Sequence, residues 1–262
     1  MKMGFMQVYN EVNWIGYAID QAMMLCDKLL ITEGSQFVAF PDISERSTDG
    51  TLDSISDKSK QYGGRIICLN TTRKHGNYRH NQCDNFNRAL TFCDIGDYFI
   101  QLDADDFYLD EWIAEANELM REKKVDLIKA LTYEFAFSFK WRFEYEQHRV
   151  PLVIIKRTEK SHFIPTHKYT NFGENVIVIP GIGCHHYVWV KSPERMLIRM
   201  RTSGMYSGMV EWFKETWLKM KIEDGKTYQS YRGNFTIHRY SGSHPSVLKH
   251  HPWRDIDDVR KI

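Results

Sequence analysis

The sequence predicts an α/β fold with a mostly parallel central sheet, and three observations support this prediction. Short apolar runs alternate with amphipathic stretches through the first 130 residues, as strands and helices do when they take turns along a chain. Polar residues directly follow several of these runs, as ligand-binding residues do at the carboxyl ends of parallel strands. Beyond about residue 130 the segments become aromatic and β-rich.

The first half of the chain is expected to hold four strands and four helices. The expected strands cover residues 4–9, 28–32, 65–69 and 97–102. The first helix is expected to have Asn13 as its N-cap, because apolar residues follow Asn13 at helical spacing. The second helix is expected to end at Gly63-Gly64. The other three helices are expected over residues 47–62, 81–92 and 110–123.

The second half is expected to add short strands and two further helices. Its apolar segments cover residues 126–130, 133–139, 150–156, 175–179 and 184–190, and its helices 193–202 and 211–221. The sequence has no internal repeat and no clear linker. We therefore expect one compact domain with two functional halves, residues 1–130 and 131–262.

Composition excludes several classes of protein. The chain has 35 Lys+Arg against 34 Asp+Glu, so electrostatic capture of nucleic acid is not its main work. No apolar run approaches the roughly 18–20 residues needed for a transmembrane segment, and the first residues become polar too early for a secretory signal. The five cysteines are scattered, without a C-x-x-C pair, and are expected to be reduced thiols in a cytoplasmic protein.

A cluster of carboxylates is the main chemical signal. Asp103, Asp105 and Asp106 follow a buried strand within four positions, and their mutual repulsion has to be offset. Hard oxygen ligands suit Mg²⁺ or Mn²⁺, which also bind phosphates. The alternative is a solvated turn in which Asp105 or Asp106 caps the next helix.

Five segments together resemble glycosyltransferase family 2 in order and approximate spacing. They are Tyr9-Asn10-Glu11, Glu33, Ser47-Thr48-Asp49-Gly50-Thr51, Asn87-Arg88-Ala89-Leu90 and Leu102-Asp103-Ala104-Asp105-Asp106-Phe107. The resemblance covers roughly residues 4 to 112. It implies a GT-A type, Rossmann-like nucleotide-binding fold with a β-rich and helical acceptor region at the C-terminal side. It also implies a nucleotide-diphosphate sugar as donor and a divalent cation, Mn²⁺ or Mg²⁺, that bridges the diphosphate.

The resemblance assigns roles to individual residues. Asp103 resembles the contact to ribose and nucleotide and shares the metal with Asp105, which resembles the metal ligand of the D-x-D motif. The remaining residues that it places at the nucleotide sugar are Tyr9, Asn10, Glu11, Glu33, Asp49, Asn87 and Ala104. Two features depart from the family pattern: residues 34–46 separate Glu33 from Asp49, and Phe86 replaces an expected Arg. Arg73, Lys74 or Arg79 is expected to supply the missing phosphate-facing charge.

The adjacent pair His185-His186 is the second candidate for metal binding. Neighbouring residues on a strand point to opposite faces, so one of the two reaches the carboxylates, and we favour His186. The alternative is that both histidines are structural. Shortly afterwards Arg195, Arg199 and Arg201 place positive charge on a helix, where they could stabilise a departing diphosphate or simply form a solvated face.

Glu134 is our first candidate for the general base, because it follows the first strand of the acceptor half, where the resemblance implies the acceptor pocket. Asp106 is the second, and Glu174 and Glu194 remain alternatives. Each of these carboxylates could equally be a surface charge. The aromatic and polar tail, residues 240–253, resembles a lid or acceptor platform.

The sequence therefore predicts a metal-dependent, inverting glycosyltransferase of the hexosyltransferase type. Its expected partners are a nucleotide-diphosphate sugar, with UDP assumed as the nucleotide, and a glycan or other hydroxyl acceptor. One alternative is a sugar-phosphate nucleotidyltransferase, although the N-terminal Gly-rich loop that would hold a triphosphate is missing. Another is a non-catalytic carbohydrate-binding protein on the same fold. Zinc-dependent hydrolysis is a third, and no H-E-x-x-H motif supports it.

Overall fold

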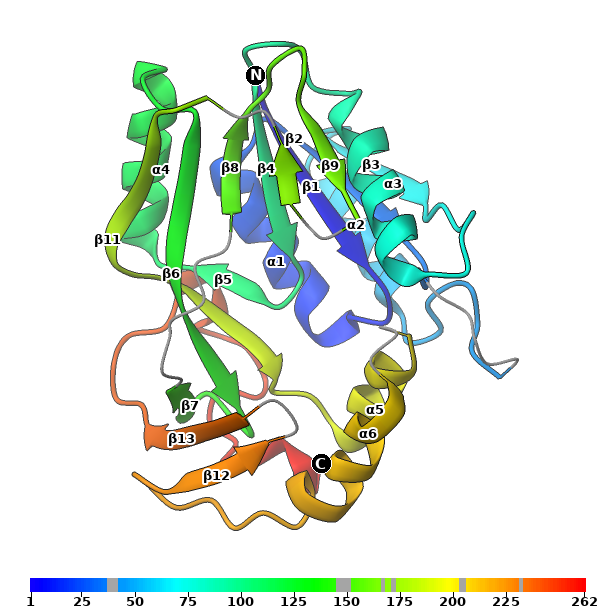
Figure 1. Cartoon of the computed structure of the whole chain (residues 1–262), viewed down its shortest axis with the longest axis vertical. Helices are drawn as coiled ribbons and strands as arrows, with labels where there is room; N and C mark the ends of the chain where they lie inside the picture. The colour runs from blue at the N-terminus through cyan, green and yellow to red at the C-terminus, as the bar shows by residue number, and fades with distance from the viewer. Residues whose placement is uncertain (37–41, 145–151, 166–167, 171–172, 203–205, 231–232) are drawn as a thin grey trace.

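A large mixed sheet organises the molecule in the computed structural model shown in Figure 1, which describes residues 1–36, 42–144, 152–165, 168–170, 173–202, 206–230 and 233–262. Within these residues nine strands form a continuous path in the order β12-β13-β7-β6-β8-β4-β1-β2-β3; β11 joins it at β6, and β5 pairs with β11. The bounds of these strands are β1 Lys2–Val8, β2 Lys28–Glu33, β3 Ile66–Asn70, β4 Tyr98–Asp103, β5 Asp106–Tyr108, β6 Leu127–Ala136, β7 Trp141–Glu144, β8 Leu152–Lys156, β11 Val176–Trp189, β12 Thr227–Ser230 and β13 Gly233–Arg239. A separate pair consists of β9 His162–Ile164 and β10 Lys168–Thr170.

The described part of the chain also forms six α-helices. Their bounds are α1 Val12–Leu25, α2 Thr51–Gln61, α3 Tyr78–Leu90, α4 Asp110–Glu122, α5 Pro193–Thr202 and α6 Tyr206–Trp212. A π-helical turn, Phe213–Trp217, continues α6, and two 3₁₀ turns, Ser246–Leu248 and Val259–Lys261, lie near the C-terminus. None of the helices described here combines the length and the apolar character needed to cross a membrane.

The N-terminal part of the sheet is parallel and buried on both faces. Strands β4, β1, β2 and β3 run parallel to one another, with Gln7 opposite Asp103 and Val8 opposite Glu33. Alternation in β1 sends Phe5 into a core with α3 and Met6 into a core with α1 and α4. This arrangement brings the carboxyl ends of β1, β2 and β4 to one edge, which is where the sequence placed its candidate site.

The second half extends the sheet with long strands. β11 pairs with β6 in parallel and with β5 antiparallel, so it connects the end of the parallel part of the sheet to the aromatic second half. A third apolar core packs α5, α6 and the π-helical turn against β13 and the end of β6. In Figure 1 this part lies below the parallel strands, with the C-terminus at the bottom.

Most expected elements are confirmed within a few residues, and four details differ. The helix α1 begins at Val12, so the prediction of Asn13 as its N-cap is wrong. Residues 127–136 form one strand, whereas two strands, 126–130 and 133–139, were expected. Residues 176–189 also form one strand, whereas 175–179 and 184–190 were expected as two. The helix expected over 211–221 starts earlier, at Tyr206, and passes into the π-helical turn. Of the strand expected over 150–156, residues 150 and 151 lie outside the described residues.

Candidate active site

Three carboxylates lie at the junction between β4 and β5. Asp103 is the last residue of β4, and Asp106 is the first residue of β5. Between them Asp105 accepts a hydrogen bond from the backbone N–H of Tyr187 through its own carbonyl oxygen, at 2.8 Å. Because β5 pairs antiparallel with β11, this hydrogen bond and the strand register bring His186 directly opposite Asp106.

Asp105, Asp106 and His186 form a buried group that could hold a metal ion. Each offers a ligand atom, and these atoms lie within 4.8 Å of one another. The His186 Nδ1 atom contacts Asp106 Oδ1 directly and lies 3.8 Å from Asp105 Oδ1. Two carboxylates and an imidazole fit Mn²⁺, and the carboxylates also suit Mg²⁺. Asp103, the other carboxylate of the D-x-D motif, lies outside this group of three.

Two cationic side chains contact the other carboxylate oxygen of Asp105. Its Oδ2 atom lies 2.6 Å from Arg199 Nη1 and 3.2 Å from Lys191 Nζ. Burial alone would raise the pKa of Asp105, but the charges of Lys191 and Arg199, with that of His186, outweigh it and hold this pKa well below its ordinary value. Asp105 therefore stays ionised inside the protein, ready to act as a ligand.

Lys191 and a further cation, Arg195, connect this site to the loop after β1. Lys191 Nζ lies 2.7 Å from Glu11 Oε2, and Arg195 Nη2 lies 3.2 Å from Glu11 Oε1. Arg195 also donates to the carbonyl oxygen of Tyr9. Arg195 and Arg199 were singled out from the sequence, but Lys191 was not, because a single lysine after an apolar strand gives no pattern that distinguishes it from a surface residue.

Other predicted nucleotide-binding residues brace the loop that precedes α2. Glu33 is fully buried, accepts a hydrogen bond from Ser47 N at 2.7 Å and forms an ion pair with Arg46. Asn10, in the left-handed region at φ 52°, accepts from Thr48 N at 2.8 Å. Asp49 ties the same loop to the start of α1, where it accepts from Val12 N at 3.1 Å. The structure therefore brings Asn10, Glu33 and Asp49 together, and their described hydrogen bonds hold the loop. Ala104 is buried between Asp103 and Asp105.

Two predicted residues on α3 lie elsewhere. The side-chain amide of Asn87 makes both of its described backbone hydrogen bonds with one residue of β9: it accepts from Phe163 N at 2.8 Å and donates to Phe163 O at 3.0 Å. Arg79 lies on the exposed first turn of α3, just after its N-cap Asn77. Neither has a described contact with Asp105, Asp106 or His186.

Glu134 lies beside the candidate metal group on the neighbouring strand. In the β6–β11 pair it is opposite His186, and His186 is in turn opposite Asp106 in the β5–β11 pair. Residues opposite one another in paired strands project from the same face of a sheet. The register therefore places Glu134, His186 and Asp106 side by side across three strands.

The other histidine of the pair faces away from the carboxylates. His185 is fully buried, and its ring nitrogens lie 3.4 Å from Tyr187 Oη and 3.3 Å from Tyr240 Oη. Burial, reinforced by the neighbouring His244, lowers the pKa of His185 to about 3. The structure thus brings only His186 of the pair to the carboxylates, as the alternation along a strand predicts.

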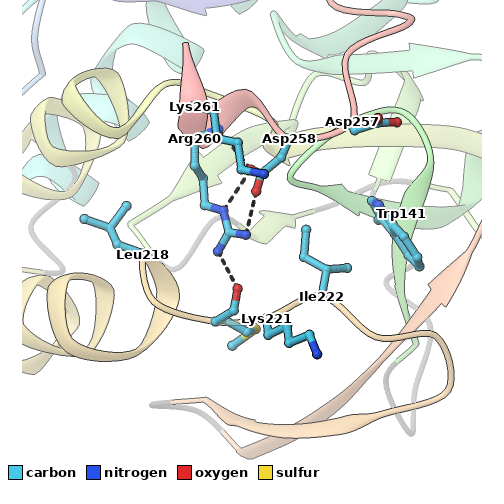
Figure 2. Close-up of a pocket in the computed structure, with 9 residues that line it drawn as sticks. Trp141, Leu218, Lys221, Ile222, Asp257, Asp258, Arg260 and Lys261 are labelled. Atoms are coloured by element: carbon cyan, nitrogen blue, oxygen red, sulfur yellow. Dashed lines mark hydrogen bonds and ion pairs between the residues drawn. The ribbon is translucent and has the colours of Figure 1, made fainter.

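A separate cavity of about 500 Å³ lies near the C-terminus (Figure 2). Trp141, Leu218 and Ile222 contribute apolar walls, and Lys221 and Lys261 contribute charge. Arg260 is held there by Asp258 and by the carbonyl oxygens of Trp217 and Met220. None of the residues predicted from the sequence as catalytic, nucleotide-binding or metal-binding lines this cavity.

Comparison with protein families decides the identity of the fold. The model of the family described as "Glycosyl transferase family 2" matches residues 43–181, which is more than half of the chain. The chain belongs to glycosyltransferase family 2. The match spans β3 to β10 and the first residues of β11, and it includes Asp103, Asp105 and Asp106, so the family assignment confirms the predicted GT-A type, Rossmann-like α/β fold.

Solved structures give more distant likenesses to this family 2 member. Residues 1–349 of S. aureus TarS are 12% identical, with a TM-score of 0.48, over 85% of this chain and 75% of that one. A second structure of S. aureus TarS is 12% identical, with a TM-score of 0.46, over 71% of this chain; the match spans only 36% of that protein. Glucosyl-3-phosphoglycerate synthase from Mycobacterium tuberculosis, solved with Mn²⁺, UDP and glucosyl-3-phosphoglycerate, is 16% identical over 52% of this chain and 44% of its own, with a TM-score of 0.32. No curated protein matches the chain in sequence.

Proposed function

We propose that this family 2 member transfers a sugar from a nucleotide-diphosphate donor to a hydroxyl acceptor, with inversion at the anomeric carbon and with the help of a divalent cation. The observation that carries the proposal is the buried group Asp105, Asp106 and His186, next to a set of cationic side chains. In this proposal residues 1–130 hold the donor, and residues 131–262 hold the acceptor.

Asp105, Asp106 and His186 would hold the cation, Mn²⁺ or Mg²⁺. When bound, the cation would offset the negative charge of the donor diphosphate. Asp103 ends β4 beside this group and is proposed to contact the ribose. The loop braced by Asn10, Glu33 and Asp49 would border the nucleotide, with UDP as the assumed nucleotide.

Arg195 and Arg199 would stabilise the departing diphosphate. Two N–H groups of Arg195, on Nε and Nη1, are buried without a hydrogen-bond partner among the described residues. A buried donor left unpaired costs about 1–3 kcal/mol, and phosphate oxygens are strong acceptors for a guanidinium. The geometry therefore favours an anionic ligand next to Arg195, where the leaving group would gain negative charge.

Glu134 is proposed as the general base. Its carboxylate would take the proton from the acceptor hydroxyl as that oxygen forms its bond to the anomeric carbon and the diphosphate leaves from the opposite face. The register beside His186 supports this role, because the acceptor and the diphosphate have to meet at the same place. Asp106 is the second candidate, but its direct contact with His186 favours a part in metal binding.

A thermal-shift panel tests the donor assignment. The melting temperature would be measured with UDP, GDP and dTDP, each with and without Mn²⁺. A ligand that binds only the folded protein adds about 2.7 kcal/mol of stability at one hundred times its dissociation constant, so the correct nucleotide should raise the melting temperature clearly.

The variant Asp105→Asn tests whether the Mn²⁺-dependent part of the thermal shift comes from the proposed metal site. We expect it to lose the part of the shift that depends on Mn²⁺, whereas Asp53→Asn, on the exposed face of α2, should keep it. Incubation of wild-type protein with the matching nucleotide sugar should then release the nucleoside diphosphate. No shift with any of the nucleotides, together with no such release, would contradict the proposed function.

A further inference from the structure

The two oxygens of Asp105 face different surroundings. Oδ1 faces His186 and the candidate metal group, whereas Oδ2 contacts Lys191 and Arg199. A cation held through Oδ1 would therefore have two fixed positive charges on the other side of the same carboxylate. This arrangement is unusual for a ligand whose task is to attract a divalent ion.

The two cations on Oδ2 differ in exposure. The Lys191 side chain has no exposed surface, and its ammonium bridges Asp105 and Glu11. The ammonium also lies 6.0 Å from the ring centre of Trp14. The Arg199 side chain comes from α5 and is 30% exposed, so water and salt screen its charge more than that of Lys191. Lys191 is thus the fully buried cation of the site.

Cationic side chains surround Asp105 before any ligand binds. Lys191 and Arg199 contact Asp105, Lys191 and Arg195 contact Glu11, and Asp106 contacts His186. A divalent cation entering alone would add two positive charges beside these cations in a poorly hydrated place. A nucleoside diphosphate brings the negative charge that would offset them.

We propose that Lys191 makes metal binding depend on the nucleotide: its buried charge weakens the binding of a free divalent cation, so that the cation is held tightly only together with a nucleoside diphosphate. The inference rests on the proposed function, since it takes the donor to be a diphosphate. Lys191 touches neither ligand in this scheme and acts through Asp105, as a positioning and charge-setting residue. By linkage, the factor by which the nucleotide strengthens cation binding equals the factor by which the cation strengthens nucleotide binding.

The variant Lys191→Met tests this proposal. Methionine keeps an unbranched side chain in the buried position and removes the charge, while Arg199 and Arg195 still pair with Asp105 and Glu11. Free Mn²⁺ would be measured by its electron paramagnetic resonance signal during titration of the protein, first alone and then with saturating UDP, or with GDP or dTDP if the panel selects one of them. We expect the variant to bind Mn²⁺ alone at least about fivefold more tightly than the wild type, and the enhancement by nucleotide to shrink by a similar factor.

Two controls distinguish a local effect of the Lys191 charge from a change in overall charge or in folding. Lys226→Met removes a lysine that pairs with the exposed Glu223, so it makes the same change in net charge far from the site and should leave both titrations unchanged. Circular dichroism and the melting temperature of each variant without ligands would establish that it is folded. A merely structural role of Lys191 predicts weaker Mn²⁺ binding in Lys191→Met, the opposite of our expectation.

Unchanged or weaker binding of Mn²⁺ alone by a folded Lys191→Met would overturn the inference, as would a wild type that binds Mn²⁺ equally well with and without nucleotide. The proposed function fails by a different result, namely the absence of both nucleotide binding and donor cleavage in the wild type. Arg199→Met completes the set. Because the partly exposed Arg199 is screened by solvent more than the fully buried Lys191, its loss should change the binding of Mn²⁺ alone less than the loss of Lys191.

Discussion

Asp105 shows how one side chain can belong to two networks. Its Oδ2 atom takes part in an ion network that joins the end of β11, the last turn of α5 and the loop after β1. Its Oδ1 atom belongs to the group that could hold a metal. Since a buried carboxylate without partners would shift toward its neutral form, the cations are what keep this carboxylate charged.

At the same scale, Glu134→Gln tests the assignment of the general base. The amide keeps the size of the side chain but cannot accept a proton from the acceptor. We expect the turnover number to fall about 100-fold or more, with little change in the Mn²⁺-dependent thermal shift produced by the nucleotide. Initial rates of nucleoside diphosphate release in the presence of an acceptor would measure it.

Glu194→Gln is the matched comparison for Glu134. Glu194 lies in the first turn of α5 and was also a candidate from the sequence. If Glu194→Gln loses the activity and Glu134→Gln retains it, the base is on α5, and the assignment of Glu134 is wrong.

Individual site residues could be predicted only where a pattern marks them. The carboxylates after β4 and the choice of His186 followed from their position on apolar strands, and the structure brings these residues together. Lys191 could not be found, because its importance comes from burial between Glu11 and Asp105, which are 180 and 86 positions away in the chain. The contact of Asn87 with β9 was equally hidden, since it depends on a strand of only three residues.

Among the elements, β11 differs most from its expected form. The run Pro180-Gly181-Ile182-Gly183 has the composition of a turn, and so the segment was expected to contain two strands. The structure continues as one strand and absorbs this run as register shifts in its pairing with β6. Local composition could not reveal this, because the pairing partner on β6 lies about 50 residues earlier.

Gly183 in β11 packs directly against the Trp112 side chain of α4, which leaves no room for a larger residue. A Cβ atom at this position would lie 2.2 Å from the Trp112 ring of α4, which is too close for any ordinary contact. We expect Gly183→Ala to destabilise the protein by about 1–3 kcal/mol, because helix and strand would have to separate. For a chain of this size each kcal/mol lowers the melting temperature by about 2–4 °C, which differential scanning calorimetry would detect.

Gly76→Ala provides the reference for that measurement. A Cβ atom there would meet nothing within 4 Å, and its backbone lies outside the left-handed region. A melting temperature for Gly183→Ala equal to that of Gly76→Ala would show that α4 does not restrict β11 at this point.

Over the whole molecule, the C-terminal tail returns to the N-terminal helix. The His251 ring stacks on Trp14 at 4.3 Å between ring centres, and its Nε2 atom lies 2.9 Å from the carbonyl oxygen of Asn13. Further along, Val259 N donates to the carbonyl oxygen of Phe137 at 2.7 Å. The tail therefore joins α1 to the chain after β6. A lid or an acceptor platform was expected over residues 240–253, and the described contacts of His251 and Val259 are with the body of the fold.

This tail gives the stability of the molecule a pH dependence. Burial lowers the pKa of His251 from 6.5 to about 4, so between these values the unfolded chain binds a proton that the folded protein does not. Stability from this residue is therefore complete above about pH 6.5 and is lost as the pH falls toward 4. We expect His251→Gln to reduce the slope of unfolding free energy against pH by up to roughly 1.4 kcal/mol per pH unit in that range.

Urea unfolding at several pH values between 4.5 and 6.5 would measure these slopes. His250→Gln is the control, because that side chain is exposed and the same substitution there should leave the slope unchanged. Equal slopes for the wild type and His251→Gln would mean that the histidine is not held neutral by the fold. His185 and His244, whose pKa values burial also lowers, to about 3 and about 4, are expected to supply the remaining slope.

The overall fold was predictable because it follows from repeating features. The parallel strands β1 to β4 and the helices between them leave a clear hydrophobic period in the sequence. The added strands β5, β7, β12 and β13 were not predicted. They are short or lie at the far edge of the sheet, and their pairing depends on chain segments distant in sequence.

The alternation of His185 and His186 limits how this chain can change in length during evolution. A substitution at either position removes one side chain, but insertion or deletion of a single residue within the stretch of β11 opposite β5 would exchange the two faces of the strand. An imidazole would then leave the carboxylates, and a polar ring would leave the aromatic core, in one step. Insertions and deletions should therefore be far less tolerated between Cys184 and Tyr187 than in the register-shifted stretch just before it.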